Sequence, residues 1–150
     1  MSLPVSLKEV VGELDALSQG MIAYCNRKTG KVTSLTERML AAVEEEEDLS
    51  GFDEDMLAEL RGIVNSEDWV ALPDSFEIHE WEILRRFVER VEDDRIREEL
   101  LRAIHGAGAF RRFKEVARRH GLEESWYDFK RSALERIARE ALDAAGIPYA

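Results

Sequence analysis

The sequence contains a single cysteine, three histidines and three prolines, and its apolar runs are only a few residues long. Cys25 alone excludes an intrachain disulfide and is typical of a reducing cytoplasm. The short apolar runs exclude a membrane-spanning helix, which needs about 20 apolar residues. Residues 1–4 lack the basic and apolar regions of a secretory signal. We therefore expect a cytoplasmic protein without a membrane partner.

The scarcity of cysteine and histidine also argues against metal and nucleophile chemistry. A zinc site needs several such ligands at fixed spacing, and the zinc-protease helix motif that His79-Glu80 begins is broken by Ile83. The acidic residues 53–55 lack the glycine and glutamate of a calcium loop and are better read as a first helical turn. Nucleophile-elbow and Walker motifs are absent as well. We therefore predict no metal, no cofactor and no catalytic residue, and interpret Cys25 as a small buried hydrophobe.

Length and composition indicate an ordinary globular chain. It has 150 residues, of which 45% are hydrophobic and 35% are charged. A chain of this size can bury a sizeable core without disulfides or metals. The like-charge run at 44–48 leads to Ser50-Gly51 and is interpreted as a solvated connection. We predict one domain over 1–150, with an acidic connection near 44–52 inside it.

The hydrophobic pattern predicts a mainly helical α+β fold. Capping residues Ser6, Asp53 and Asp74 each precede a helical apolar pattern. A hairpin is expected where strands 21–26 and 31–35 flank a connection that ends in Gly30, and a third strand is expected over 69–72. Helices are then expected over 74–91, from Asp93 or Asp94 to about 106, from 109 to 120, and over 123–145. The fold class is therefore a small antiparallel sheet of about three strands in the N-terminal half, followed by a helical C-terminal half.

Charge is distributed unevenly along the chain. The whole chain carries 21 Lys and Arg against 32 Asp and Glu, a net charge of −11. Residues 1–94 carry 9 basic and 23 acidic residues, which gives −14, whereas residues 95–150 carry 12 and 9, which gives +3. This asymmetry favours an anionic partner, or docking of acidic surface onto basic surface within or between chains.

The segment 106–114 has the strongest chemical character. Two glycines before a helix leave backbone N–H groups open at its positive end, and arginines follow in its first turn, which is how a phosphate site is built. The alternative is a helix–helix turn with solvated arginines, paired with Glu115 at a spacing of four residues. The candidate anion-binding residues are Gly106, Gly108, Arg111, Arg112, Lys114, Arg118 and Arg119.

Aromatic residues interleave with these cations, as they do in proteins that stack on single-stranded nucleic acid. Phe110 and Phe113 share the apolar face of their helix, and Trp126 and Phe129 open the apolar stripe of the last one. These four are interpreted as core residues. Tyr127 lies at the edge of that stripe and is the aromatic residue we expect to be exposed.

The run Gly106-x-Gly108-Ala109-Phe110-Arg111-Arg112-Phe113-Lys114, followed by Trp126-Tyr127-x-Phe129 and the closing 145–147, resembles an uncharacterised bacterial protein family of unknown function. The turn at 24–30 and the Leu72-Pro73 step also fit, so the resemblance spans most of the chain. It implies a bacterial, cytoplasmic, single-domain protein. It brings no activity, cofactor or site residue.

Three functions stay open at this point. We favour a non-enzymatic protein-binding or regulatory module with a charge-divided surface, which engages another protein or a second copy of itself. The alternative is phosphate or nucleic-acid binding through the basic helix at 108–120. The third is an enzyme whose site is assembled from distant carboxylates, and we assign no reaction to it.

Overall fold

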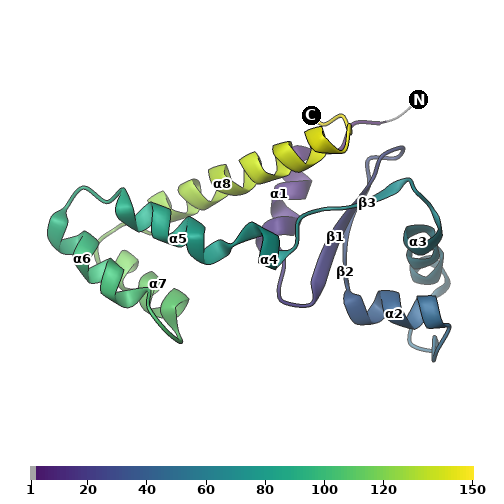
Figure 1. Ribbon diagram of the computed structural model, residues 1–150, viewed down its shortest axis with the longest axis horizontal. Helices are drawn as coiled ribbons and strands as arrows, with labels where there is room; N and C mark the ends of the chain where they lie inside the picture. Colours follow the sequence, from purple (N-terminus) through teal and green to yellow (C-terminus); the bar gives the residue numbers. More distant parts are fainter. Residues whose placement is uncertain (1–2) are drawn as a thin grey trace. The chain divides into compact units, whose positions relative to one another are not determined.

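The computed structural model describes residues 3–150, except for the side chain of Phe76, and divides into two compact units (Figure 1). The first unit contains the chain up to Ile78 together with Leu134–Ala150. The second unit is His79–Ala133. Each is described by itself.

Side-chain caps start the first helices of unit 1 where the sequence predicts them. Helix α1 (Leu7–Ala16) begins after Ser6, whose hydroxyl accepts the backbone N–H of Glu9 at 3.2 Å. Helix α3 (Glu54–Asn65) begins after Asp53, whose carboxylate accepts the N–H of Met56 at 2.7 Å. Each cap satisfies a donor that the first turn leaves without an intrahelical partner.

The three strands form one antiparallel sheet in the order β2-β1-β3. Strand β1 (Met21–Asn26) lies in the centre, between β2 (Val32–Thr36) and β3 (Trp69–Ala71). Gly30 closes the β1–β2 hairpin with φ +76°, and a Cβ there would lie 2.7 Å from the carbonyl oxygen of Pro4. Glycine is therefore required by both the backbone conformation and the space.

Helices cover both faces of the sheet. Glu13 of α1 accepts a hydrogen bond from Ser34, whereas the next residue, Leu35, packs on the opposite face. That opposite face is covered by α2 (Glu37–Glu45) and α3, as Figure 1 shows. Its buried residues are Leu35, Val43, Leu60 and Ile63. We call these four residues the α2–α3 core.

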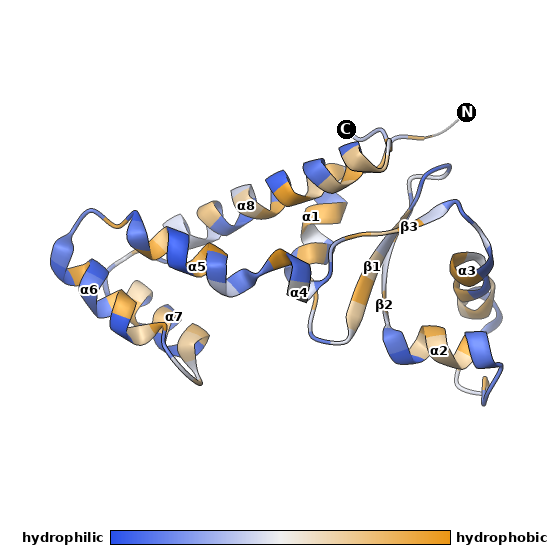
Figure 2. Cartoon of the chain, viewed as in Figure 1, coloured by the Kyte–Doolittle hydropathy of each residue, from blue (hydrophilic) through white to orange (hydrophobic). Residues whose placement is uncertain are grey.

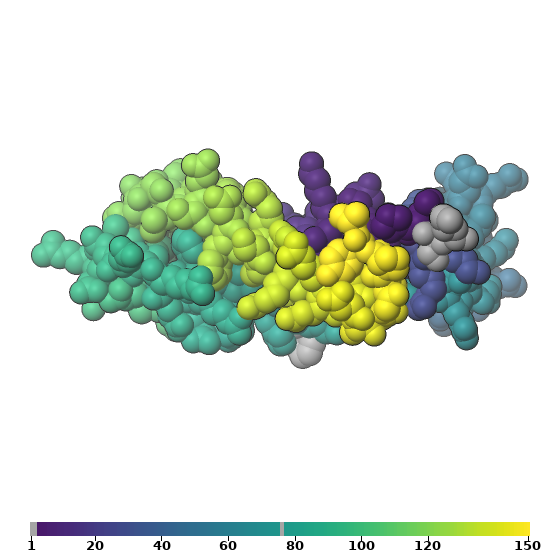
Figure 3. All heavy atoms as spheres, turned by 90° about the horizontal axis from the view of Figure 1, so that it is seen from above, coloured from purple at the N-terminus to yellow at the C-terminus, as the bar shows by residue number. Residues whose placement is uncertain are grey.

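Segments from both ends of the chain meet in unit 1. Val5 forms a parallel bridge with Tyr149, and the N–H of Leu7 donates to the carbonyl of Ala150 at 3.1 Å. In the space-filling view of Figure 3, purple N-terminal residues lie beside the yellow end of the chain. Val5 and Ile147 are buried.

Unit 2 is a helical unit with an aromatic core. It contains α5 (Glu80–Glu89), α6 (Asp94–Ala103), α7 (Ala109–Arg119) and the part of α8 (Glu123–Ala144) up to Ala133. Phe87 lies edge-on to Phe113 and to Trp126, with ring centroids 5.9 and 5.5 Å apart. Phe129 lies 5.5 Å from Phe87. Edge-to-face geometry is favoured because the positive ring edge meets a negative ring face.

The helix expected over 74–91 is not continuous. It divides at His79, which has φ +53°, into α4 (Ser75–Ile78) and α5. Asp74 and Glu77 do form the reciprocal cap expected of them. The apolar periodicity continues across His79, so the pattern alone gives no sign of the break. The break coincides with the boundary between the two units.

The predicted fold class is confirmed: the protein is mainly helical α+β, with a three-stranded antiparallel sheet in its N-terminal half and helices in its C-terminal half. The description as one domain stays a prediction. Among the helices that the structure describes, none is both long and apolar enough to cross a membrane.

Candidate functional site

The turn between α6 and α7 holds four of the residues predicted to bind an anion. Gly106 and Gly108 have φ +77° and +80°, and Gly108 is the N-cap of α7 without a side-chain cap. The Arg112 guanidinium reaches back to this turn and donates to the carbonyls of Ala103 at 3.0 Å, of Ala107 at 2.6 Å, and of His105. Arg112 therefore holds the turn together, and three backbone acceptors engage its donors.

The guanidinium of Arg111 also approaches this turn, but none of the backbone carbonyls that accept from Arg112 accepts from it. Its Nη2 lies 3.7 Å from the point that a Cβ on Gly108 would occupy, and Arg112 Nη1 lies 3.2 Å from it. Arg111 and Lys114 are exposed, and no ion pair of either is found within the described part of the chain. The structure thus brings Gly106, Gly108, Arg111 and Arg112 together and leaves two cations of α7 open to solvent.

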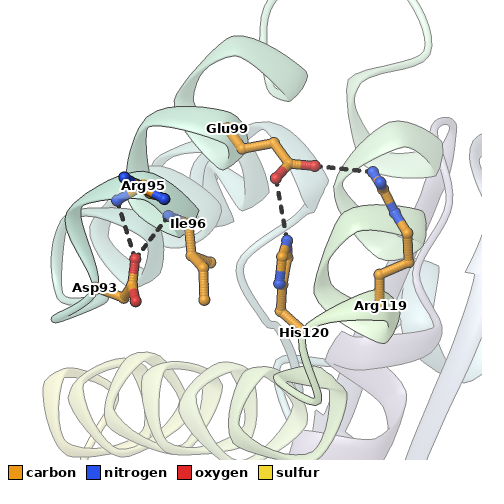
Figure 4. A network of polar contacts seen from close by, with 6 residues as sticks. All are labelled: Asp93, Arg95, Ile96, Glu99, Arg119 and His120. Atoms are coloured by element: carbon orange, nitrogen blue, oxygen red, sulfur yellow. Dashed lines mark hydrogen bonds and ion pairs between the residues drawn. The ribbon is translucent and has the colours of Figure 1, made fainter.

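The other two predicted residues, Arg118 and Arg119, lie at the opposite end of α7, and carboxylates engage both; Figure 4 shows the contacts of Arg119. Arg119 pairs with Glu99 of α6 at 2.9 Å, and Arg118 lies 3.9 Å from Glu123. His120 lies 3.1 Å from the second oxygen of Glu99. Within the described part of the chain no ion pair joins Glu115 to an arginine, as the alternative reading had expected, and the partners of Arg118 and Arg119 come from α8 and α6. The carboxylates lower the local positive charge that an anion would meet.

The contacts of Glu99 affect how the stability of the fold depends on pH. Its pKa is lowered, first by the hydrogen bond from His120 and then by the nearby positive charges of Arg119, His120 and Arg102. A carboxyl whose pKa is lower folded than unfolded contributes stability that is present above the unfolded pKa. That contribution disappears as pH falls through the folded pKa.

We therefore expect the wild type to lose stability between about pH 5 and pH 3, and Glu99→Gln to lose less over the same range. Urea unfolding at a series of pH values measures it. Parallel stability curves for the two proteins over this range would contradict the assignment.

The aromatic residues divide between core and surface. Of the four aromatic residues expected in the core, Phe113 and Trp126 are buried, and Phe110 and Phe129 are half-buried. Tyr127 is 46% exposed, as expected. Trp81, at 36% exposure, is the aromatic residue whose exposure the sequence did not indicate. Its indole N–H donates to the carbonyl of Ile104 at 2.8 Å, which orients the ring at the α6–α7 turn. Phe113 and Trp126 therefore offer no stacking surface, whereas the ring of Phe129 already carries the guanidinium of Arg90, 5.2 Å from its centroid.

A second charged feature lies in unit 1, and we call residues 44–55 the acidic connection. It has five carboxylates at 44–48, three at 53–55, and no Lys or Arg. All eight residues are exposed, and none joins an ion pair within the described part of the chain. Asp48 accepts the Ser50 hydroxyl at 2.6 Å, which lowers the pKa of Asp48, and Asp53 caps α3. The connection therefore retains a dense, uncompensated negative charge.

Part of this charge lies at the unfavourable end of a helix. Glu44 and Glu45 form the last residues of α2, and Glu46 caps it with φ +51° (Figure 2, blue). The C-terminus of a helix carries partial negative charge and is stabilised by cations, so these glutamates oppose it. Burial raises the pKa of Tyr24 on the sheet, and the charges of Glu44 and Glu37 raise it further. The run of acidic residues is visible in the sequence. That part of it lies at the negatively polarised C-terminus of a helix depends on where α2 ends.

Apolar side chains interrupt the acidic connection. Leu49 and Phe52 are half-buried and pack against the α2–α3 core. The N–H of Phe52 donates to the carbonyl of Leu49 at 3.2 Å, so the two residues close a short turn between α2 and α3. Carboxylates precede and follow this turn. The available sequence signal was one acidic and one apolar residue on either side of Ser50-Gly51, namely Asp48-Leu49 before it and Phe52-Asp53 after it.

Metal ligands and the single cysteine can be assessed among the described residues. No group of three or more His, Cys, Asp or Glu is placed to hold a metal ion there. Cys25 is fully buried, as predicted, and burial raises the pKa of its thiol, which disfavours the reactive thiolate.

Comparisons with protein-family models, curated proteins and solved structures find no match.

Proposed function

We propose that the protein is a non-enzymatic binding module whose acidic connection engages a cationic region of a partner protein. One observation carries the proposal: eight exposed carboxylates lie in residues 44–55, and no internal cation is paired with any of them among the described residues. By contrast, Arg112, Arg118 and Arg119 of the basic helix are engaged within unit 2.

The electrostatics favour a partner in two ways. Clustered charge of one sign raises the local concentration of oppositely charged molecules and speeds their encounter. A cation bound beside Glu44 and Glu45 would also neutralise charge that opposes the end of α2. Binding therefore relieves an unfavourable interaction that the free protein contains.

Binding of fluorescently labelled decalysine, followed by anisotropy over a salt series, tests the proposal. We expect the wild type to bind at low salt and to lose affinity as salt screens the charges. Glu44→Gln/Glu45→Gln/Glu47→Gln should weaken binding by about 3- to 100-fold, since each of the three surface contacts contributes about 0.2–1 kcal/mol.

The matched control is Glu92→Gln/Glu98→Gln/Glu140→Gln. It removes the same net charge at exposed glutamates that have no ion pair in the described part of the chain. Equal weakening by both variants would show that only net charge matters. Absence of wild-type binding at low salt would reject the proposal.

Phosphate or nucleic-acid binding is the second candidate function, and the convergence of Arg111 and Arg112 at Gly108 favours it. The charge-reversal variant Arg111→Glu/Lys114→Glu leaves Arg112 to hold the turn. Salt-sensitive binding of labelled single-stranded RNA or DNA that this variant loses would support the candidate. Absence of wild-type binding at low salt would reject it.

A further inference from the structure

Strand β2 forms one edge of the sheet, because β1 is its only neighbour among the described strands. At one end of β2, the carbonyl of Lys31 accepts the N–H of Asn26 at 2.8 Å. At the other end, the N–H of Glu37 donates to the carbonyl of Gly20 at 2.9 Å. Successive residues of an antiparallel strand turn their N–H and C=O groups to opposite sides, so every second residue between these ends faces away from β1. These residues are Val32, Ser34 and Thr36.

The outer side of β2 is open to a further strand. Within the described part of the chain, the N–H and C=O groups of Val32 and Ser34 have no backbone partner. Four of the five residues of β2 are half-buried, and only Leu35 is buried. A row of unpaired N–H and C=O groups on an edge strand is a template for pairing with another chain.

The two edges of the sheet differ in how they are protected. Strand β3 has only three residues, and Pro73 follows shortly after its end. Short edge strands and prolines are the usual means by which proteins prevent edge pairing. Strand β2 contains no charged residue and no proline, and its register with β1 runs without a bulge from Val32 to Thr36. The edge of β2 therefore lacks the protection that β3 has.

A second copy of the chain fits this edge in charge as well as in backbone direction. In an antiparallel pair about a two-fold axis at Ser34, the outward groups of Val32 lie opposite those of Thr36 of the second copy. Lys31 of each copy then lies opposite Glu37 of the other. The Lys31 side chain is 59% exposed, although its Nζ lies 3.3 Å from Glu59, and Glu37 is exposed as well. Opposite charges that face each other across two strands stabilise the pair.

We propose that two copies of this chain associate through β2, which pairs antiparallel with β2 of the second copy and joins the two sheets into one. The occupant is a second copy because the register that aligns the outward backbone groups also brings Lys31 opposite Glu37 at both ends. This dimer goes beyond the proposed binding role of the acidic connection and does not depend on it.

Sedimentation velocity of the wild type over a series of protein and salt concentrations tests the proposal. We expect a monomer–dimer equilibrium that shifts toward the dimer as salt is added, because two copies of charge −11 repel each other and salt screens this repulsion. Decalysine binding to the acidic connection should respond to salt in the opposite direction. A wild type that stays monomeric at every protein and salt concentration would overturn the dimer and leave the proposed function intact.

Amide chemical shifts of the ¹⁵N-labelled protein locate the interface in the same concentration series. The expected changes centre on Val32, Ser34 and Thr36. Concentration-dependent changes confined to other parts of the chain would overturn the assignment to β2.

Charge reversal tests the register. Lys31→Glu places like charges opposite each other at both ends of the paired strands, and so does Glu37→Lys. Each variant alone should dimerise about tenfold more weakly than the wild type. An equal mixture of the two should recover the affinity, because opposite charges again face each other at both ends of the mixed dimer. A folding defect would not be repaired by mixing.

Lys8→Glu is the matched control for Lys31→Glu. Lys8 is exposed on α1, and the substitution changes the net charge by the same amount. It should therefore change the affinity much less. Equal weakening by Lys8→Glu, or a mixture that associates no better than either variant alone, would overturn the proposed pairing.

Ser34→Pro tests the backbone contact at the axis. Proline removes an N–H that faces away from β1, a position at which an edge strand tolerates it. We expect this variant to keep the circular dichroism of the wild type and to lose the dimer. Ser34→Ala removes the hydroxyl that donates to Glu13 but keeps the N–H, so it should still dimerise. A folded Ser34→Pro variant that dimerises like the wild type would overturn the proposal.

Discussion

Phe113→Ala should lower the free energy of unfolding by about 3–5 kcal/mol, the range for a large aromatic side chain removed from a core. Phe113 is fully buried. Its ring lies 5.9 Å from that of Phe87 and 5.1 Å from that of Trp126, so alanine would remove contacts to α5 and α8 at once. The cavity would be lined by aromatic rings that cannot close it without leaving their own favourable geometry.

Urea unfolding followed by near-ultraviolet circular dichroism measures this effect, because the signal reports the packing of the aromatic rings. Tyr127→Ala is the control, since Tyr127 is 46% exposed and should change stability by less than about 1 kcal/mol. Equal effects of the two substitutions would show that the aromatic core of unit 2 is not packed as described.

Arg112→Lys should cost about 2–3 kcal/mol, although it keeps the charge. The guanidinium donates from three nitrogens to the carbonyls of Ala103, His105 and Ala107. A single ammonium group cannot match this fork, so carbonyls of the turn would lose a charged donor. Thermal or urea unfolding at neutral pH provides the measurement.

Arg111→Lys is the matched substitution on the neighbouring residue. Arg111 is exposed and forms no ion pair within the described part of the chain, so its replacement should change stability by less than about 0.5 kcal/mol. If Arg112→Lys were equally harmless, Arg112 would be available to a ligand, as the sequence alone suggested.

Much of the fold could be predicted because its signals are local. Ser6, Asp53 and Asp93 accept N–H groups two or three residues ahead, so each cap and its helix lie in one short window of sequence. The hairpin at Gly30 is likewise set by the few residues between its strands. Such features require no knowledge of what packs against them.

The parts that could not be predicted depend on contacts between distant residues. Arg112 looked like an exposed member of a basic face, yet its guanidinium turns back to a carbonyl nine residues earlier. Arg119 lies 20 residues from its partner Glu99, and a helical projection of α7 cannot show that pairing. The candidate anion site therefore has fewer open cations than the sequence indicated.

The acidic connection is a second feature that the sequence showed only in part. Its charge was visible in the sequence, and it was interpreted only as a solvated connection. Its significance depends on the end of α2 at Glu45, which places like charges against the negative end of that helix, and on the packing of Leu49 and Phe52. Residues that break a local rule in this way are expected at functional positions.

The most direct measurement is urea unfolding, at low salt, of the wild type and of Glu44→Gln/Glu45→Gln/Glu47→Gln, each with and without decalysine. We predict that the variant alone is more stable by about 1 kcal/mol, because charges that oppose the end of α2 have been removed. Decalysine should stabilise the wild type and stabilise the variant much less, since a ligand stabilises a folded state in proportion to how tightly it binds it. A variant that is less stable than the wild type, or one that decalysine stabilises equally, would contradict the binding role of the acidic connection.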